Sequence, residues 1–252
     1  MKKLVLVLFL LFGFYTSSFS QLKKLPPLML IDLPTAGTLQ KGSYVSNLRL
    51  YPNGGLLASL SIGLSNRVYL GLAFGGENII GEGKVNWNPE PGIHFVYRII
   101  DENIALPAVT IGYQSQGYGP YLEVGDIKRY SVKSRGFYAV GSKNYAFLGD
   151  LSFHGGINYS LESGDVDEDL NFFIGVSKSL NPELTLLSEY DLATNDNGSK
   201  SIGDGKGYLN IGIRWLFAKR LAIQFQMKNI LENKENVPYS NREIRISYLE
   251  FF

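Results

Sequence analysis

The last eleven residues of the chain, 242–252, alternate between apolar and polar side chains and end on two phenylalanines. Side chains of an extended strand point alternately to opposite faces. One face therefore carries Ile244, Ile246, Tyr248 and Phe252, and the opposite face carries Glu243, Arg245, Ser247 and Leu249. Glu250 is the one polar residue on the apolar face. Such a strand must place one face against an apolar environment and the other against a polar one.

The same alternation recurs from residue 41 onward, whereas helix signals are nearly absent. It is clearest in residues 56–64 and 68–75. Further alternating segments cover 44–50, 93–99, 106–113, 151–159, 172–176, 184–192, 208–215 and 221–228. Residues 135–142 are one more expected strand, but their weak alternation does not assign the two faces. Together these segments give about twelve strands, at roughly 9–11 residues for each membrane crossing.

The connections between these segments alternate between short and long. The short ones lie near Asn66, Glu102, Asn144, Asn181 and Lys219, and apart from the turn at 52–55 the others are long. Short turns at one end and long loops at the other are typical of an up-and-down membrane barrel. The pattern therefore predicts an all-β fold, an antiparallel up-and-down transmembrane β-barrel of about twelve strands spanning residues 41–252.

A soluble lipocalin-like barrel or β-sandwich is the alternative, and its apolar face would point inward. A dozen strands is too many for a small ligand barrel. The polar faces are also rich in glycine, serine, asparagine, glutamine and arginine, which suits a wet interior better than a packed core. Both observations favour the membrane barrel.

The chain begins with a segment that has the order of a secretory signal peptide. Lys2 and Lys3 precede an apolar stretch, and small polar residues follow up to Ser20, so residues 1–20 are expected to be removed and the mature chain to start at Gln21. The apolar stretch is shorter than the roughly 20 residues of a spanning helix, which argues against a membrane anchor. Pro26, Pro27 and Pro34 cannot donate to a sheet, so residues 21–40 are interpreted as a periplasmic N-terminal lead-in.

Composition excludes several classes of function. The chain has no cysteine, which removes a lipoprotein anchor, disulfides and thiolate metal sites. Its net charge of +1 gives no field that would attract nucleic acid. No cofactor is expected.

The terminal strand resembles the C-terminal assembly signal of outer-membrane barrels, with Tyr248 and Phe252 at the signal positions. This resemblance implies the outer membrane of a Gram-negative bacterium, with outer-membrane lipids and the barrel-assembly machinery as partners. An even strand count would leave both termini in the periplasm.

Three passages resemble the YjbH-like family of outer-membrane barrels, which is associated with exopolysaccharide export. They are residues 33–37 (Leu-Pro-Thr-Ala-Gly), residues 112–119 (Gly-Tyr-Gln-Ser-Gln-Gly-Tyr-Gly) and residues 138–144, which end on Ser-Lys-Asn. The resemblance covers roughly two-thirds of the mature chain and implies a short, single-barrel version. It carries no catalytic residues.

Interior positions of the expected strands supply the candidate functional residues. The candidate lumen-lining set is Arg49, His94, Arg98, His154, Glu189, Asp191, Arg214, Lys228, Glu243 and Arg245. These charges can pair across the lumen, or they can line a channel that prefers anionic or hydroxyl-rich solutes, because guanidinium groups bind carboxylates well.

Catalytic and metal sites are weakly indicated. Ser152 and His154 invite comparison with the outer-membrane phospholipase, but the order of the two residues is reversed and both are expected to face the lumen. The two histidines lie on distant strands and do not form a ligand cluster by spacing. The loop acids Glu162, Asp165, Asp167, Glu168 and Asp169 lack the glycine and distal glutamate of a calcium loop, so they are interpreted as a solvated face.

Three functions are consistent with these observations. The first is a non-catalytic channel or export-associated component for saccharides or small polar or anionic solutes. The second is a structural or assembly barrel with a plugged lumen. The third is an outer-membrane hydrolase.

Overall fold

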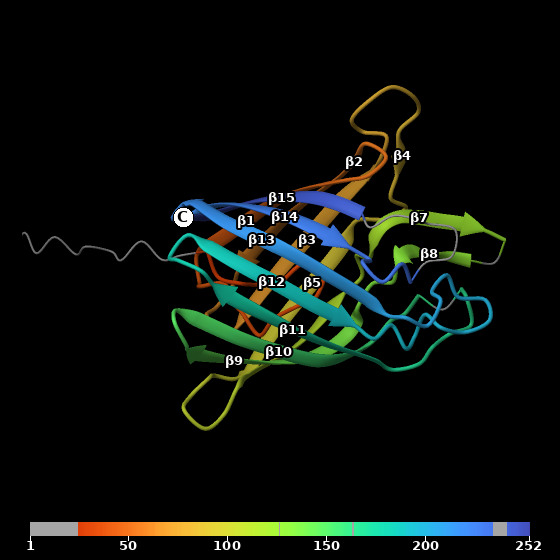
Figure 1. Cartoon of the computed structure of the whole chain (residues 1–252). Coiled ribbons are helices and arrows are strands. Elements are labelled where there is room, and N and C mark those ends of the chain that lie inside the picture. Colours follow the sequence, from red (N-terminus) through yellow and green to blue (C-terminus); the bar gives the residue numbers. More distant parts are fainter. Residues whose placement is uncertain (1–24, 126, 163, 234–240) are drawn as a thin grey trace, which may run out of the picture.

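The computed structural model describes residues 25–125, 127–162, 164–233 and 241–252, and within them twelve antiparallel strands close into a barrel (Figure 1). The barrel strands are β1 (Ser43–Tyr51), β2 (Gly55–Gly63), β3 (Val68–Glu77), β5 (Gly92–Ile100), β6 (Ala108–Gln114), β9 (Gly136–Ala146), β10 (Asp150–Tyr159), β11 (Asn171–Ser179), β12 (Leu184–Asp191), β13 (Tyr208–Ala218), β14 (Leu221–Lys228) and β15 (Asn241–Phe251). Each strand pairs with the next barrel strand along the chain, and β1 also pairs with β15, which closes the barrel. The predicted fold is confirmed.

Two ends of the barrel differ in their connections (Figure 1). We call the end where β1 starts and β15 finishes the base, and the opposite end the mouth. The base carries short connections such as residues 64–67, 147–149 and 219–220. The mouth carries the long ones, together with a tight turn between β1 and β2 in which Asn53 and Gly54 both have positive φ, as the two central residues of a type I′ turn require.

Two elements at the mouth are absent from the sequence-based prediction. Strand β4 (Asn86–Trp87) pairs with the end of β3. Strands β7 (Tyr118–Val124) and β8 (Ile127–Val132) form a separate hairpin within the connection from β6 to β9. Residues 114–134 were expected to be an irregular loop, and the hairpin corrects that expectation.

The outer surface of the barrel is an apolar belt. Leu60, Leu72, Ile211 and Phe225 are 43%, 57%, 42% and 49% exposed, whereas the neighbouring Ser61 and Gln224 face inward and are 7% and 2% exposed. Strand β9, whose faces the sequence does not assign, points Phe137 outward and Tyr138 and Val140 inward. Exposed apolar side chains in such a belt are favourable in lipid and unfavourable in water, so the barrel spans a membrane. No helix in the described part of the chain could cross a membrane, and this finding concerns helices alone.

Strand β15 holds the barrel closed. It is paired with β1 from Ser43 opposite Phe251 to Leu50 opposite Ile244. The backbone N–H of Phe252 donates to the carbonyl of Gly42 at 3.0 Å, and its ring stacks on Tyr44 with a centroid distance of 6.1 Å. The terminal residue therefore extends the seam between the first and last strands.

Deleting Phe252 is expected to slow membrane assembly and leave synthesis and export unchanged, because the deletion removes an exposed apolar ring and the last bond of the seam. The folded fraction is measured by the shift of the heat-stable barrel on unheated gels. Phe252→Tyr keeps an aromatic ring and serves as the control. Normal assembly of the truncated chain would show that Phe252 is not an assembly signal.

Candidate functional site

The N-terminal segment lies inside the barrel. Residues 25–40, which we call the plug, were expected to be a lead-in outside the barrel, and the structure corrects this. Leu30, Ile31 and Leu33 are fully buried, and Asp32 is 1% exposed. The prolines do keep the plug out of the sheet. They do not keep it out of the lumen, because side chains of the lumen wall can bind the N–H and carbonyl groups of the plug.

The plug folds back on itself as a short hairpin. Met29 and Pro34 form an antiparallel bridge, and the N–H of Leu30 donates to the carbonyl of Leu33 at 3.0 Å. Leu30 and Ile31 pack on the inward-facing Leu187 of β12, and Leu33 joins a buried cluster with Val96 and Leu249. The expected wet interior is therefore partly a packed core.

Glu189 of β12 holds the tip of this hairpin. Its carboxylate accepts backbone N–H bonds from Ile31 at 2.9 Å, Asp32 at 2.8 Å and Leu33 at 3.0 Å. Asn210 of β13 donates to the same carboxylate at 2.8 Å. Four donors on one buried carboxylate compensate much of its desolvation cost. They hold the tip of the plug in the half of the lumen nearer the mouth.

The tip residue Asp32 completes a buried charge cluster. Its carboxylate accepts from Arg49 of β1 at 2.6 Å and from Lys228 of β14 at 2.7 Å. Both cations also contact Glu243 of β15, at 2.5 Å and 3.3 Å. The cross-lumen ion pairs expected from the sequence therefore run through a residue of the plug.

Two further arginines of the lumen wall bind the plug through its carbonyl groups. Arg214 of β13 donates to the carbonyl of Met29 at 2.7 Å, and Arg245 of β15 donates to the carbonyl of Ile31. Gln224 donates to the carbonyl of Leu30 at 3.0 Å. Four cations of the wall thus surround the tip of the plug, residues 29–32, and three carboxylates, those of Asp32, Glu189 and Glu243, lie among them.

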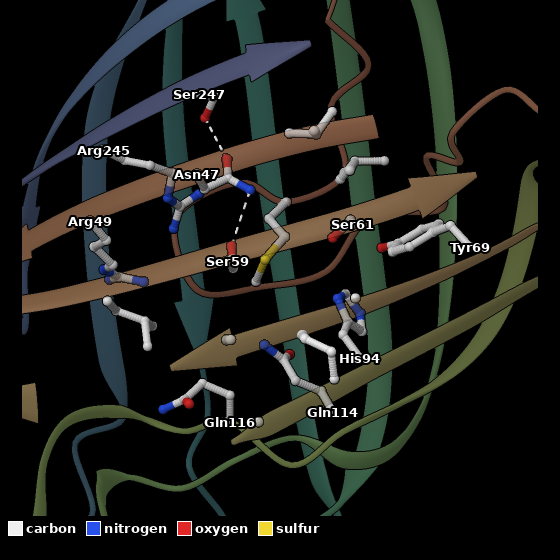
Figure 2. Close-up of a pocket in the computed structure, with 18 of the residues that line it drawn as sticks. Asn47, Arg49, Ser59, Ser61, Tyr69, His94, Gln114, Gln116, Arg245 and Ser247 are labelled. Carbon is white, nitrogen blue, oxygen red and sulfur yellow. Dashed lines mark hydrogen bonds between the residues drawn. The ribbon is translucent and has the colours of Figure 1, made fainter. Parts of the chain in front are cut away.

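A cavity remains beside the plug, between it and the wall of β15, β1, β2, β3, β5 and β6 (Figure 2). Its volume is about 100 Å³. Polar wall residues around it include Asn47, Arg49, Ser59, Ser61, His94, Gln114, Gln116, Arg245 and Ser247. Leu25, Pro26, Leu28 and Met29 of the plug close its other side.

The other candidate lumen residues are placed outside the charge cluster. His94 contacts the hydroxyl of Tyr138 at 2.8 Å, and Arg98 donates to the carbonyl of Ala36 at 3.2 Å near the base. Asp191 pairs with Arg135 below the mouth. Each of the ten candidates lies at an inward-facing position of its strand. The tip of the plug brings together Arg49, Glu189, Arg214, Lys228, Glu243 and Arg245, and Arg98 binds the plug nearer the base.

His154 pairs across strands with Ser142, and not with Ser152. Its Nδ1 contacts the hydroxyl of Ser142 on β9 at 2.8 Å. Ser152 donates to Asn144 at 2.5 Å instead. Ser152 therefore has no hydrogen bond to His154 that could activate its hydroxyl. The described residues also contain no group of three or more histidine, aspartate or glutamate side chains that could hold a metal ion.

A second buried charge cluster lies at the mouth. Arg129 of β8 donates to Asp165 and Asp196, and Lys133 donates to Asp165 at 2.7 Å. Burial alone would raise the pKa of the Asp167 carboxyl. The backbone N–H groups of Asn197 and Gly198, in the loop after β12, donate to this carboxyl and lower its pKa below the usual value. Asp165 and Asp167 are 2% and 9% exposed, so the interpretation of these acids as a solvated face is wrong for both.

Sequence reasoning missed Asp32, Gln114, Gln116 and Arg129 as parts of the interior. One signal was available. Leu187 and Leu249 fall on otherwise polar strand faces, and inward-facing leucines need an apolar partner inside the lumen. That partner is the plug.

Comparison with known proteins supports the fold. No family model matches the chain, and no curated protein matches it. Among solved structures, a KdgM porin has a TM-score of 0.51 at 12% identity, and the match covers 83% of this chain and 99% of that one. A KdgM porin in complex with disordered oligogalacturonate has a TM-score of 0.50 at the same identity and coverage. At this identity the similarity establishes a shared barrel architecture and no more.

Proposed function

We propose that this protein is an outer-membrane channel for small anionic or hydroxyl-rich solutes, closed in this conformation by its own N-terminal plug. Both termini would lie in the periplasm, so that the plug enters from that side. The observation that carries the proposal is the match between the wall and the plug. Arg49 and Lys228 bind a carboxylate of the plug, and Arg214 and Arg245 bind its carbonyl oxygens.

A sugar acid presents the same kinds of group, a carboxylate and several oxygen acceptors. If the plug left the lumen, the wall around its tip would expose four cations against the carboxylates of Glu189 and Glu243. Guanidinium groups bind carboxylates and hydroxyl groups in fixed geometry, which favours such solutes over cations. The saccharide class is also supported by the fold shared with a porin described in complex with oligogalacturonate.

The resemblance to YjbH-like barrels adds a role associated with exopolysaccharide export to this proposal. The solute would then be a saccharide carried outward. The competing function is a structural barrel whose lumen stays closed, and the number of bonds between plug and wall favours it. The two functions differ in one property, which is whether the lumen conducts once the plug is removed.

Planar bilayer recording separates them. We expect the full mature chain to conduct weakly, and a variant lacking residues 25–37 to show stable openings with a preference for chloride over potassium. A plug-free barrel that folds but never conducts would establish the structural function instead.

Selectivity of the plug-free barrel should depend on the wall cations. Replacing Arg214 and Arg245 with glutamine is expected to move the reversal potential in a salt gradient toward zero, because two of the four cations are lost. Arg67→Gln is the matched control, since Arg67 lies in a base turn with a 50% exposed side chain. An unchanged reversal potential in the double variant would contradict anion selection by this cluster.

A further inference from the structure

The cavity beside the plug contains polar atoms that no protein group satisfies. Within the described residues seven buried side-chain nitrogen or oxygen atoms lack a hydrogen-bond partner, and three of them belong to residues lining this one cavity. They are Nη1 of Arg49, Oε1 of Gln114 and Oε1 of Gln116, on side chains of residues only 4%, 5% and 4% exposed. Each unsatisfied buried group costs about 1–3 kcal/mol, so their convergence indicates a site built to bind something.

The space available exceeds that of a single water. The cavity measures about 100 Å³, whereas one water needs roughly 10–15 Å³ on a comparable measure. Donors and acceptors surround it on several sides, including the hydroxyls of Ser59, Ser61 and Ser247 (Figure 2). The rings of Tyr69 and Tyr118 add apolar faces to the lining.

The charges around the cavity indicate which kind of ligand it can bind. The four cations around the tip of the plug exceed the three carboxylates there by one, and Arg49, Arg214 and Arg245 all line the cavity. Nη1 of Arg49 can donate to an anion, while the two glutamine oxygens can accept only from hydroxyl or amine donors. A single negative charge combined with hydroxyl groups satisfies all three atoms.

We propose that this cavity binds a small monoanionic hydroxy acid, of the size of one sugar ring or less. This goes beyond the proposed channel function, because the site exists in the closed barrel and does not require conduction. One side of the cavity is made by Leu25, Pro26, Leu28 and Met29 of the plug. The ligand therefore binds only the plugged barrel and stabilises it. At a ligand concentration of 100 times Kd this would favour the plugged form about a hundredfold.

Isothermal titration of the detergent-solubilised mature barrel tests the proposal, with D-glucuronate and D-glycerate as probes. We expect saturable binding of at least one acid, and at least tenfold weaker binding of the matched neutral compounds, D-glucose and glycerol. Gln114→Leu combined with Gln116→Leu should weaken acid binding by about tenfold or more, because two acceptors are removed.

Thr110→Val is the matched control. Thr110 is a fully buried residue of β6 with an unpartnered hydroxyl that does not line the cavity, so its loss should leave binding within about twofold. Ser61→Met, which fills the cavity with a larger apolar side chain, should also abolish binding and serves if the double glutamine variant fails to fold. The variant lacking residues 25–37 should not bind.

Failure of both acids to bind the wild-type barrel would overturn the proposal, as would unchanged binding in the double glutamine or cavity-filling variant. Binding that survives removal of the plug would overturn the assignment of the site to the closed state. None of these results depends on conductance, so the channel proposal and this one can fail separately.

Discussion

Replacing Asp32 with alanine is expected to release the plug and open the lumen. Asp32 is the only plug carboxylate that contacts Arg49 and Lys228 among the described residues, and all three side chains are at most 5% exposed. Removing one partner of a buried charge pair typically costs about 3–5 kcal/mol. Because Arg49 and Lys228 keep Glu243 as a shared partner, we expect the lower end of this range, and the plugged population should fall relative to the open one by on the order of a hundredfold.

Cysteine labelling measures this release directly. The chain has no native cysteine, so Leu33→Cys places a single thiol at a fully buried position of the plug. A membrane-impermeant maleimide should react slowly with this variant and much faster when Asp32→Ala is added. Bilayer conductance should rise in parallel.

Asp204→Ala provides the control for this experiment. Asp204 pairs with Lys206 in the loop between β12 and β13, where both side chains are about half exposed, and exposed pairs contribute only about 0–1 kcal/mol. It should leave both labelling and conductance unchanged. If Asp32→Ala also leaves them unchanged, the plug is held by its packing and its Glu189 bonds, and not by the charge cluster.

Arginine on the outer belt is expected to destabilise the barrel by about 2–4 kcal/mol when it lies near the membrane midplane. Leu60, Leu72, Ile211 and Phe225 are the positions to test, because each lies within a barrel strand and is exposed on its outer face. The cost arises because the charge is transferred from water into hydrocarbon. Denaturant unfolding of the refolded barrel in lipid vesicles gives the free energy of unfolding for each variant.

The control must be an inward position that the plug does not occupy. Gly212 and Gln224 are unsuitable, because a Cβ at Gly212 would lie 3.3 Å from Ile31 and Gln224 binds the plug. Ala73 is half-buried beside Leu72 and lines the cavity. Ala73→Arg should therefore cost less than Leu72→Arg, and equal costs would contradict the assignment of the outer face to lipid.

The plug and an anionic solute would bind the same cations of the lumen wall. A lumen lined only by the ten candidate residues would be a wet channel, whereas the structure places in it a hairpin whose Asp32 pairs with the wall cations Arg49 and Lys228. The same cations can therefore serve two purposes, binding the plug when the barrel is closed and binding an anionic solute when it is open. Proton, salt or ligand effects on conductance should be interpreted as effects on this competition.

The sequence alone determined the barrel and the direction of its side chains. Alternation is a local property, because neighbouring residues of a strand must face opposite sides. Leu60 and Ser61, or Ile211 and Gly212, could thus be assigned without knowing which strands pair. The candidate lumen residues were found in the same way, and they lie at inward-facing positions of their strands.

Only the tertiary structure decided what occupies the interior. Pro26, Pro27 and Pro34 exclude residues 21–40 from a sheet, but no local rule distinguishes a segment outside the barrel from one inside it. The position of the plug depends on contacts between residues far apart in the chain, such as Asp32 with Lys228 and Ile31 with Glu189. Asp165 and Arg129 likewise become buried partners only because separate loops meet at the mouth. Such long-range pairings follow from the closure of the barrel, which brings distant strands around one axis.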